Sequence, residues 1–342
     1  MKLTYRTRRR LHRLGVTLGY LTLAAVIVLI CWFIWLERFV VYTGEGAELQ
    51  FDYESPVGIA EVATQPEEAT VAIHYNEGDE FVNTSTELAQ LRGYYATTDV
   101  LARGVDGVAA LIQDLPAGSA IMLDVKSGFG TFYYSSTLEE APITDQVDVT
   151  KMDTLIRELA SKDTYLIARV PAFRDRNYGL NHTIYGLPVA SGGYLWADSE
   201  NCYWLNPISN GTLSWLITIA TELKEIGFDE VVFTDFKFPD TDNILFESSM
   251  GKQEALESAA ETLVSTCSTS KFCVSFETSN PLFQLPEGRS RLYLTDIAAG
   301  NAAEAAENAN VADPTINLVF LTNTNDTRFD EFGAMRPMPG LN

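Results

Sequence analysis

Short apolar segments alternate with amphipathic ones along residues 92–323, and this alternation constrains the fold most strongly. Seven segments have strand length and a high content of apolar residues; they lie at 92–100, 119–130, 164–173, 230–239, 271–279, 291–297 and 316–323. Segments with the apolar spacing of helices separate most of them; they lie at 104–116, 148–163, 210–227, 252–267 and 298–310. A regular strand–helix–strand order predicts a parallel sheet with right-handed crossovers.

A closed barrel explains this pattern better than an open doubly wound sheet. Residues 127–132 (SGFGTF) do not match GxGxxG, and residues 250–253 (MGKQ) do not match a phosphate-binding loop. We therefore predict an α/β fold of the TIM type, with polar residues at the strand ends. Seven strands are one short of eight, and residues 330–342 read as a poor eighth strand. The predicted barrel is thus incomplete, or an N-terminal strand closes it.

The N-terminal segment predicts a membrane anchor. Residues 14–36 carry no charge, and as a helix they would span about 35 Å, enough for the roughly 30 Å hydrocarbon core. Six basic residues precede this segment, and residues 1–36 contain no acid. This charge distribution predicts a cytoplasmic N-terminus and an outside C-terminus. A cleaved signal peptide would have an apolar core of only about 7–15 residues, followed by small residues.

The expected organisation follows from these segments. A basic cytoplasmic segment (1–13) precedes a transmembrane signal anchor (14–36), a stalk with possible short strands (37–90), the barrel (91–325) and a tail (326–342). All 46 acids and 18 of the 24 basic residues lie after residue 36, so the exported part has a net charge of −28. This charge repels nucleic acid and is compatible with a neutral glycan, and it leaves protein partners unknown.

Histidine and cysteine are scarce. Of three histidines, only His74 and His182 follow the predicted anchor, which argues against a His-ligated metal site, and no GxSxG elbow is present. We predict neither a cofactor nor a metal. Cys267 and Cys273 could form a disulfide outside the cytoplasm, or remain thiols.

Charged residues at the ends of the predicted strands are the candidate site. They are Asp124, Lys126, Arg169, Asp175, Asp235, Lys237, Glu277 and Asp296. In a TIM barrel these ends converge on one mouth. Glycoside hydrolysis needs two carboxyl groups beside the scissile bond, and Asp235 and Glu277 lie on adjacent predicted strands. The competing interpretation is structural, because Asp235 and Lys237 share a strand face and could simply form an ion pair.

The predicted loop at 174–207 is rich in aromatic residues. Among them, Trp196 and Tyr203 are the candidates for stacking on a sugar ring. The same aromatic residues could instead pack the long loop onto the barrel rim.

Four sequence blocks carry a resemblance to a known family. They are RGYYATTDVL (92–101), LDVKSGFGTFYY (123–134), LIARVPAFRD (166–175) and the segment from 203 to 239 that ends in VVFTDFKFP. Their order and spacing resemble the putative glycosyl hydrolase domain family, TIM barrels of bacterial exported proteins that are distantly similar to α-amylase-type barrels. The resemblance implies that Asp124, Lys126, Arg169 and Asp175 line a pocket.

The fourth predicted strand departs from the family pattern of Phe-Asp-Tyr followed by Arg-Phe-Pro. Thr234 occupies the family's acid position, Asp235 follows it, and Lys237 replaces the arginine. On a regular strand, a shift of one residue turns the side chain to the opposite face. The Asp of the family's Trp-Val-Asp-Pro is Asn206 in this chain.

Three hypotheses follow. The leading one is a membrane-anchored, extracellular glycoside-hydrolase-like protein with Asp235 as nucleophile or base and Glu277 as acid. In it, the substrate contacts are Asp124, Lys126, Arg169, Asp175, Lys237, Trp196, Tyr203 and Asp296. The alternative is a catalytically inactive barrel that binds a glycan or a protein at the cell surface, and the third is a structural envelope protein.

Overall fold

The computed structural model describes residues 40–43, 46–49, 88–162 and 164–339. The chain divides into two compact units, residues 1–81 and 82–342. In the first, β1 (Val40–Thr43) and β2 (Gly46–Leu49) form an antiparallel pair. The predicted basic segment and anchor lie outside the described residues, as does most of the predicted stalk. In the described ranges, no helix combines the length and the apolarity needed to cross a membrane.

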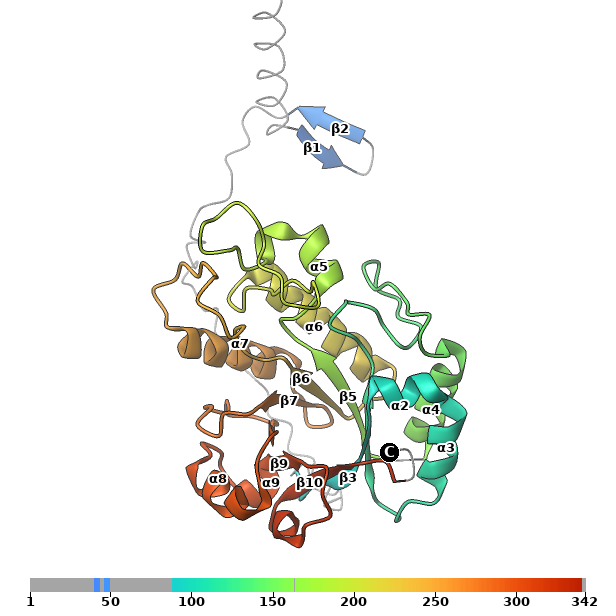
Figure 1. Cartoon of the computed structure of the whole chain (residues 1–342). Coiled ribbons are helices and arrows are strands. Elements are labelled where there is room, and N and C mark those ends of the chain that lie inside the picture. Colours follow the sequence, from blue (N-terminus) through green and yellow to red (C-terminus); the bar gives the residue numbers. More distant parts are fainter. Residues whose placement is uncertain (1–39, 44–45, 50–87, 163, 340–342) are drawn as a thin grey trace, which may run out of the picture. The chain divides into compact units, whose positions relative to one another are not determined.

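The second unit is a closed barrel of eight parallel strands (Figure 1). The strands are β3 (Arg92–Ala96), β4 (Ala120–Asp124), β5 (Leu166–Pro171), β6 (Glu230–Thr234), β7 (Cys273–Thr278), β8 (Leu292–Leu294), β9 (Leu318–Leu321) and β10 (Gly333–Pro337). Each pairs with its neighbour in the chain, and β10 pairs with β3 to close the ring. The predicted TIM-type barrel is confirmed, and each of the seven predicted segments contains one of its strands.

The eighth strand corrects the prediction of an incomplete barrel. β10 lies within the segment that we expected to be a tail, and it pairs in parallel with both β9 and β3. A Cβ at Gly333, within this strand, would lie 2.8 Å from the carbonyl oxygen of Leu318. The glycine is therefore required by close strand approach. Ala334 and Met335 are both fully buried, so this strand lacks the alternation of apolar and polar residues that marks a half-exposed strand.

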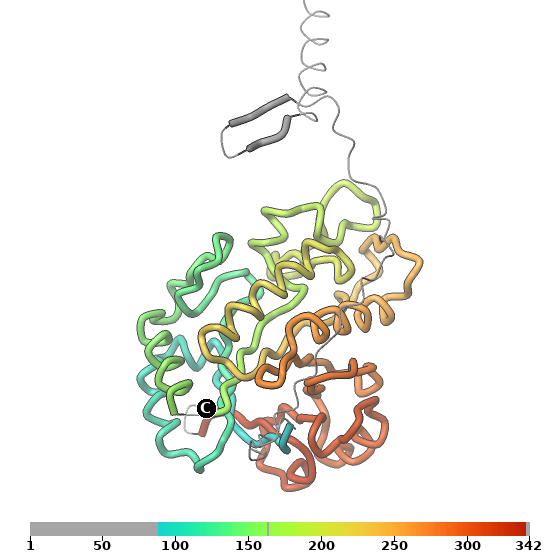
Figure 2. Tube along the Cα trace, turned by 180° about the vertical axis from the view of Figure 1, so that it is seen from behind, coloured from blue at the N-terminus to red at the C-terminus, as the bar shows by residue number. Residues whose placement is uncertain are grey.

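Helices surround the barrel (Figures 1 and 2). They are α2 (Thr98–Arg103), α3 (Val105–Gln113), α4 (Val149–Ser161), α5 (Arg176–Asn181), α6 (Asn210–Glu225), α7 (Lys252–Cys267), α8 (Ala302–Asn308) and α9 (Pro314–Asn317), with short 3₁₀ turns at Thr183–Tyr185, Ala299–Asn301 and Thr327–Glu331. α4 illustrates the sequence logic, because Met152, Leu155, Ile156 and Leu159 bury one face and Asp148 accepts a hydrogen bond from the Lys151 backbone N–H at the N-cap. Cys267 and Cys273 remain separate buried thiols.

Side chains inside the barrel form layers. A buried apolar layer contains Met122, Ile167, Val232, Val319 and Met335. Strand alternation places Asp124 and Arg169 two residues beyond Met122 and Ile167, at the carboxyl ends of β4 and β5. The apolar layer thus separates the mouth of the barrel from its opposite end.

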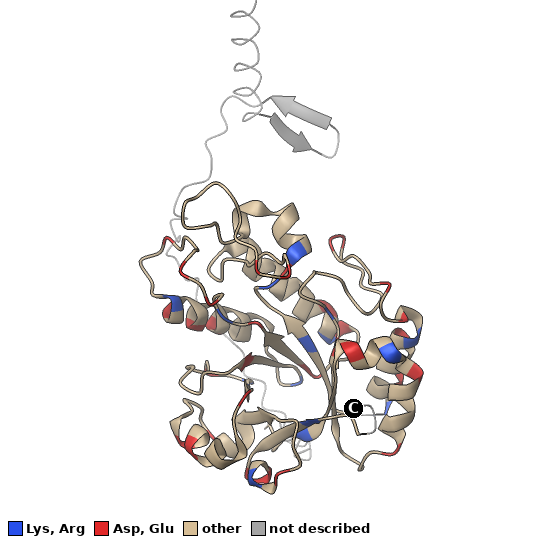
Figure 3. Ribbon diagram, viewed as in Figure 1, with Lys and Arg blue, Asp and Glu red and all other residues tan. Residues whose placement is uncertain are grey.

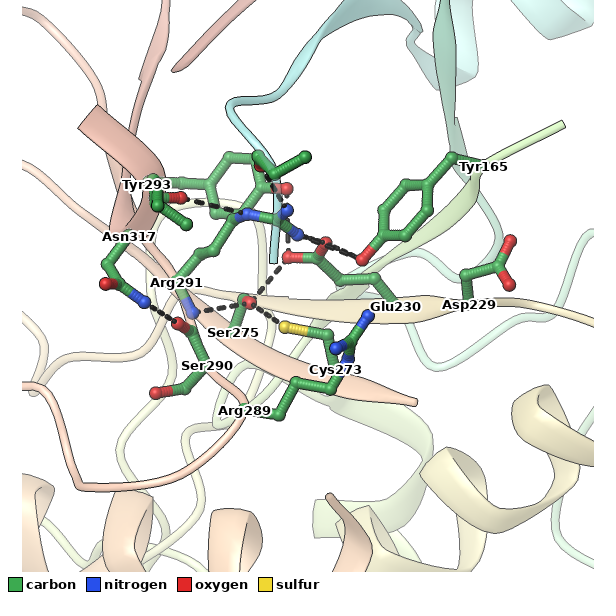
Figure 4. A network of polar contacts seen from close by, with 12 residues as sticks. Tyr165, Asp229, Glu230, Cys273, Ser275, Arg289, Ser290, Arg291, Tyr293 and Asn317 are labelled. Atoms are coloured by element: carbon green, nitrogen blue, oxygen red, sulfur yellow. Dashed lines mark hydrogen bonds and ion pairs between the residues drawn. The ribbon is translucent and has the colours of Figure 1, made fainter. Parts of the chain in front are cut away.

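That opposite end is closed by a buried ionic network around Glu230 and Arg291 (Figure 4). Arg291 Nη1 donates to Glu230 Oε2 at 2.6 Å, and the two side chains are 2% and 0% exposed. Glu230 also accepts hydrogen bonds from the hydroxyls of Tyr165, Ser275 and Tyr293. Because the amino-terminal face of a TIM barrel serves stability, we interpret this network as structural.

Candidate active site

A cavity of about 360 Å³ opens at the carboxyl ends of the strands. Charged residues are spread over the outer helices and loops as well (Figure 3), so only those lining this cavity are relevant to the site. They are Asp99, Asp124, Lys126, Arg169, Arg174, Asp235 and Glu277. The structure therefore brings five of the predicted site residues together: Asp124, Lys126, Arg169, Asp235 and Glu277.

Arg169 is the centre of this cluster. Its Nε and Nη2 donate to the two carboxylate oxygens of Glu277 at 2.7 and 2.8 Å, and its Nη1 donates to Asp124 Oδ1 at 3.1 Å. Burial favours the neutral guanidine, but the hydrogen bonds and charges of Glu277 and Asp124 outweigh it and raise the pKa of Arg169. One guanidinium therefore ties β4, β5 and β7 together through charge-assisted bonds.

The second oxygen of Asp124 is also occupied. Oδ2 accepts hydrogen bonds from the backbone N–H and the hydroxyl of Thr98, at 2.7 and 3.0 Å. The Thr98 hydroxyl also lies 3.2 Å from the Tyr133 hydroxyl. Thr98 begins α2 directly after β3, so the start of this helix holds the carboxylate in one orientation.

Lys126 and Asp175 form a buried pair, each about 1% exposed, with the ammonium 2.8 Å from Asp175 Oδ2. The contact has ion-pair distance without hydrogen-bond geometry. Asp175 also caps α5 by accepting from the Tyr178 backbone N–H, and it accepts from Trp215 Nε1. Asp175 does not line the cavity, and its partners show that it fixes the long loop to the barrel.

Asp235 reaches the cavity through its backbone conformation. β6 ends at Thr234, and Asp235 has φ of +49°, in the left-handed region that few residues other than glycine adopt. This twist offsets the one-residue shift from the family pattern, because Thr234 and Asp235 both line the cavity. Aspartate tolerates this region better than most residues, at a cost of about 1–2 kcal/mol.

Asp235 differs electrostatically from the other acids. Among the described residues, its carboxyl group makes neither a hydrogen bond nor an ion pair, whereas Glu277 and Asp124 are both held by Arg169. Burial is the main cause that raises the pKa of Asp235, and the charge of Glu277 adds to it; Arg174, Lys237 and Arg169 act in the opposite direction. Two carboxyl groups in different environments thus share one cavity.

Arg174 connects the cavity to the long loop. Its Nε donates to Asp198 Oδ2 at 2.6 Å, and its Nη2 donates to Glu200 Oε2 at 2.8 Å. Gly128 gives it room, since a Cβ there would lie 2.6 Å from Arg174 Nη1. Arg174 was not among the predicted site residues, although its position just after a strand end is a usable signal in the sequence.

The remaining predicted residues lie elsewhere. Lys237 is exposed and does not line the cavity, and Trp196 and Tyr203 are half-buried in the loop, outside it. Asp296 lines a neighbouring cavity. Phe129 and Tyr133 are the aromatic residues that line the cavity; Tyr133 is buried, whereas Phe129 is 41% exposed and offers a stacking surface. The described residues contain no cluster of three potential metal ligands.

The raised pKa of Asp235 leads to a stability prediction. We expect Asp235→Asn to stabilise the protein by about 1 kcal/mol at neutral pH, because it removes a carboxylate that burial disfavours and keeps a residue that accepts positive φ. As pH rises, the unfolded chain ionises first, so the wild type loses stability between the ordinary pKa of 3.8 and the raised folded pKa. Urea unfolding of the full chain from about pH 3 to pH 8 measures this.

The control for that series is Asp235→Ala, which also removes the charge but tolerates positive φ poorly. It should be about 1 kcal/mol less stable than the asparagine variant at every pH. A wild type that is more stable than Asp235→Asn at neutral pH would contradict the assignment of Asp235 as an unpaired, burial-disfavoured acid.

Comparison with known proteins places this site in a family context. The family described as putative glycosyl hydrolase domain matches residues 95–272, which contain every residue lining the cavity except Glu277. None of the curated proteins matches the chain.

Several solved structures are similar to this chain at low sequence identity. A hypothetical protein from Ruminiclostridium thermocellum ATCC 27405 is 20% identical, with a TM-score of 0.46 over 58% of this chain and 96% of that one. The GH20 exo β-N-acetylglucosaminidase from Vibrio harveyi is 8% identical, with a TM-score of 0.49 over 73% of this chain and 50% of that one. The α-galactosidase TtGalA from Thermus thermophilus is 12% identical, with a TM-score of 0.47 over 75% and 63%. This chain thus spans half of the Vibrio enzyme.

Proposed function

The chain belongs to the putative glycosyl hydrolase domain family, and from this premise we propose that its barrel mouth binds a glycan and hydrolyses a glycosidic bond. The observation that carries the proposal is the contrast between two of the carboxyl groups that line the cavity, those of Asp235 and Glu277. Asp235 is unpaired with its pKa raised by burial, and Glu277 accepts two hydrogen bonds from Arg169. In a pair of catalytic carboxyl groups, such a difference in environment distinguishes the general acid from the nucleophile or base.

The contacts favour Asp235 as the proton donor, the reverse of the assignment made from the sequence. Asp235 protonates the glycosidic oxygen as its bond to the anomeric carbon breaks. Glu277, whose two oxygens accept hydrogen bonds from Arg169, attacks that carbon or takes a proton from the attacking water. Water completes the reaction, giving a hemiacetal and an alcohol.

Other cavity residues would position the sugar. Asp124 presents a carboxylate whose orientation is fixed by Thr98 and Arg169, and Phe129 offers an exposed aromatic face. Apolar sugar faces pack on aromatic rings while carboxylates accept from sugar hydroxyls. In this proposal, residues 14–36 anchor the protein and the barrel faces outward, which the charge distribution of the N-terminal segment supports.

A second candidate function is glycan binding without turnover. It is favoured by Arg169, which occupies both oxygens of Glu277, and by Thr234 at the family's acid position. A Glu277 that stays fully paired would be a poor nucleophile, but the cavity would still bind a sugar.

One experiment separates the two candidates. The full chain is incubated with starch, chitin, cellulose, galactomannan and peptidoglycan, and new reducing ends and retained glycan are both measured. The matched control is the double variant Asp235→Asn with Glu277→Gln. Turnover by the wild type alone supports hydrolysis. Binding without turnover supports the second candidate, and equal turnover by both proteins rejects the assigned residues.

A further inference from the structure

A second cavity of about 310 Å³ opens at the same barrel mouth. Its lining comes from the ends of β3, β8 and β9, whereas the first cavity draws on the ends of β3 to β7. Arg169 lines both. The mouth therefore consists of two compartments that meet at the guanidinium that holds Glu277 and Asp124.

The chemistry of the second compartment suits a neutral sugar. Hydroxyl groups come from Tyr95, Thr97, Thr295 and Thr322, an amide from Asn323 and a carboxylate from Asp296. Among the described residues, the side chains of Tyr95, Asn323 and Asp296 make no hydrogen bond or ion pair with other side chains or the backbone. Burial chiefly raises the pKa of Tyr95, so its hydroxyl stays a neutral donor and acceptor.

Backbone strain marks both compartments. Asp235 and Asp296, with φ of +49° and +61°, are two of the three non-glycine residues in the left-handed region within the described ranges. Asp235 directly follows β6, Asp296 lies two residues beyond the end of β8, and each lines one compartment. Such strain gathers at ligand sites, where it aims a side chain that a regular backbone would turn away.

We propose that the second compartment is a second sugar subsite, so that the ligand is a chain of at least two sugar units crossing Arg169. This inference rests on the proposed function, because it assumes that the first compartment takes a sugar. Each volume is near the lower end of the roughly 300–1,000 Å³ of ligand pockets, room for one ring rather than several. The linkage between the two units then lies beside Arg169, where Glu277 is held.

The test compares chain lengths. The probes are one-, two- and three-unit sets of β-1,4-linked N-acetylglucosamine, β-1,4-linked glucose, α-1,4-linked glucose and β-1,4-linked mannose, titrated calorimetrically into the full chain. For the set that binds, the two-unit sugar should bind at least about tenfold more tightly than the one-unit sugar, because it gains the hydrogen bonds of the second compartment.

Two variants test whether the second compartment provides the additional affinity for the two-unit sugar. Asn323→Ala and Asp296→Asn should each weaken two-unit binding by about 2–10-fold and leave one-unit binding unchanged. Asparagine at position 296 accepts the positive φ of the native aspartate. The matched control is Asn325→Ala, which lies two residues beyond Asn323 and outside both cavities.

The outcomes distinguish the two proposals. One-unit binding as tight as two-unit binding, or second-compartment variants that behave like Asn325→Ala, would overturn the subsite and leave the proposed function standing. The absence of binding by every probe would overturn the proposed function and the subsite together.

Discussion

Asp235→Asn is expected to lower kcat for glycan hydrolysis by about 10²–10⁴-fold, the usual contribution of a positioned general acid. An amide cannot deliver the proton that the leaving oxygen needs. Glycan affinity should remain close to that of the wild type, because asparagine retains hydrogen-bonding capacity and accepts the same backbone conformation. Steady-state kinetics with the glycan identified in the turnover screen, together with calorimetric binding, measures the two effects separately.

The matched control for this variant is Asp240→Asn, which makes the same change at an exposed aspartate close in the chain and outside the cavity. It should leave kcat unchanged. If Asp235→Asn retains the wild-type kcat, or loses binding and turnover in equal measure, Asp235 is not the proton donor.

Arg291→Met is expected to have the largest effect on stability, lowering the free energy of unfolding by about 3–5 kcal/mol. The variant would leave the Glu230 carboxylate buried without its cation, although three hydroxyls would still donate to it. It would also remove hydrogen bonds from Arg291 to the carbonyl oxygens of Ala89 and Ile316. Urea unfolding of the full chain, followed by tryptophan fluorescence, measures the change.

Two comparisons make this prediction specific. Arg328→Met breaks the solvent-exposed pair with Asp326 and should change stability little, because exposed pairs contribute weakly. Adding Glu230→Gln to Arg291→Met should restore part of the loss, because it removes the uncompensated charge. Equal effects of the two arginine variants would show that the network is not a stabilising element.

The strand–helix order was readable from the sequence because it rests on local patterns. Residues 92–323 contain seven barrel strands at the predicted segments, and the apolar spacing of α4 predicted its buried face. β10 was missed because Gly333 and Pro337 normally interrupt strands. Only the approach of the Leu318 carbonyl shows why glycine is needed there. Such contacts between distant segments are invisible in a local pattern.

The site was only partly predictable for the same reason. The charged strand ends indicated the cavity, but the face of Asp235 depended on a backbone angle that the residue type allows without requiring. Arg169 on β5 contacts Asp124 on β4 and Glu277 on β7. The curvature of the barrel brings these three residues together, and their spacing along the chain does not indicate it. Aromatic content pointed to Trp196 and Tyr203, whereas the exposed aromatic residue that lines the cavity is Phe129, in a glycine-rich turn.

The most direct test of Asp235 as proton donor uses two glycosides of the sugar found in the turnover screen. One has a methanol leaving group, which needs protonation, and the other has a dinitrophenolate leaving group, which departs without it. Asp235→Asn should fail on the methyl glycoside and keep kcat within about tenfold of the wild type on the dinitrophenyl glycoside. Glu277→Gln should fail on both. The contradicting result is the reverse, with Glu277→Gln rescued by the better leaving group and Asp235→Asn inactive on both substrates.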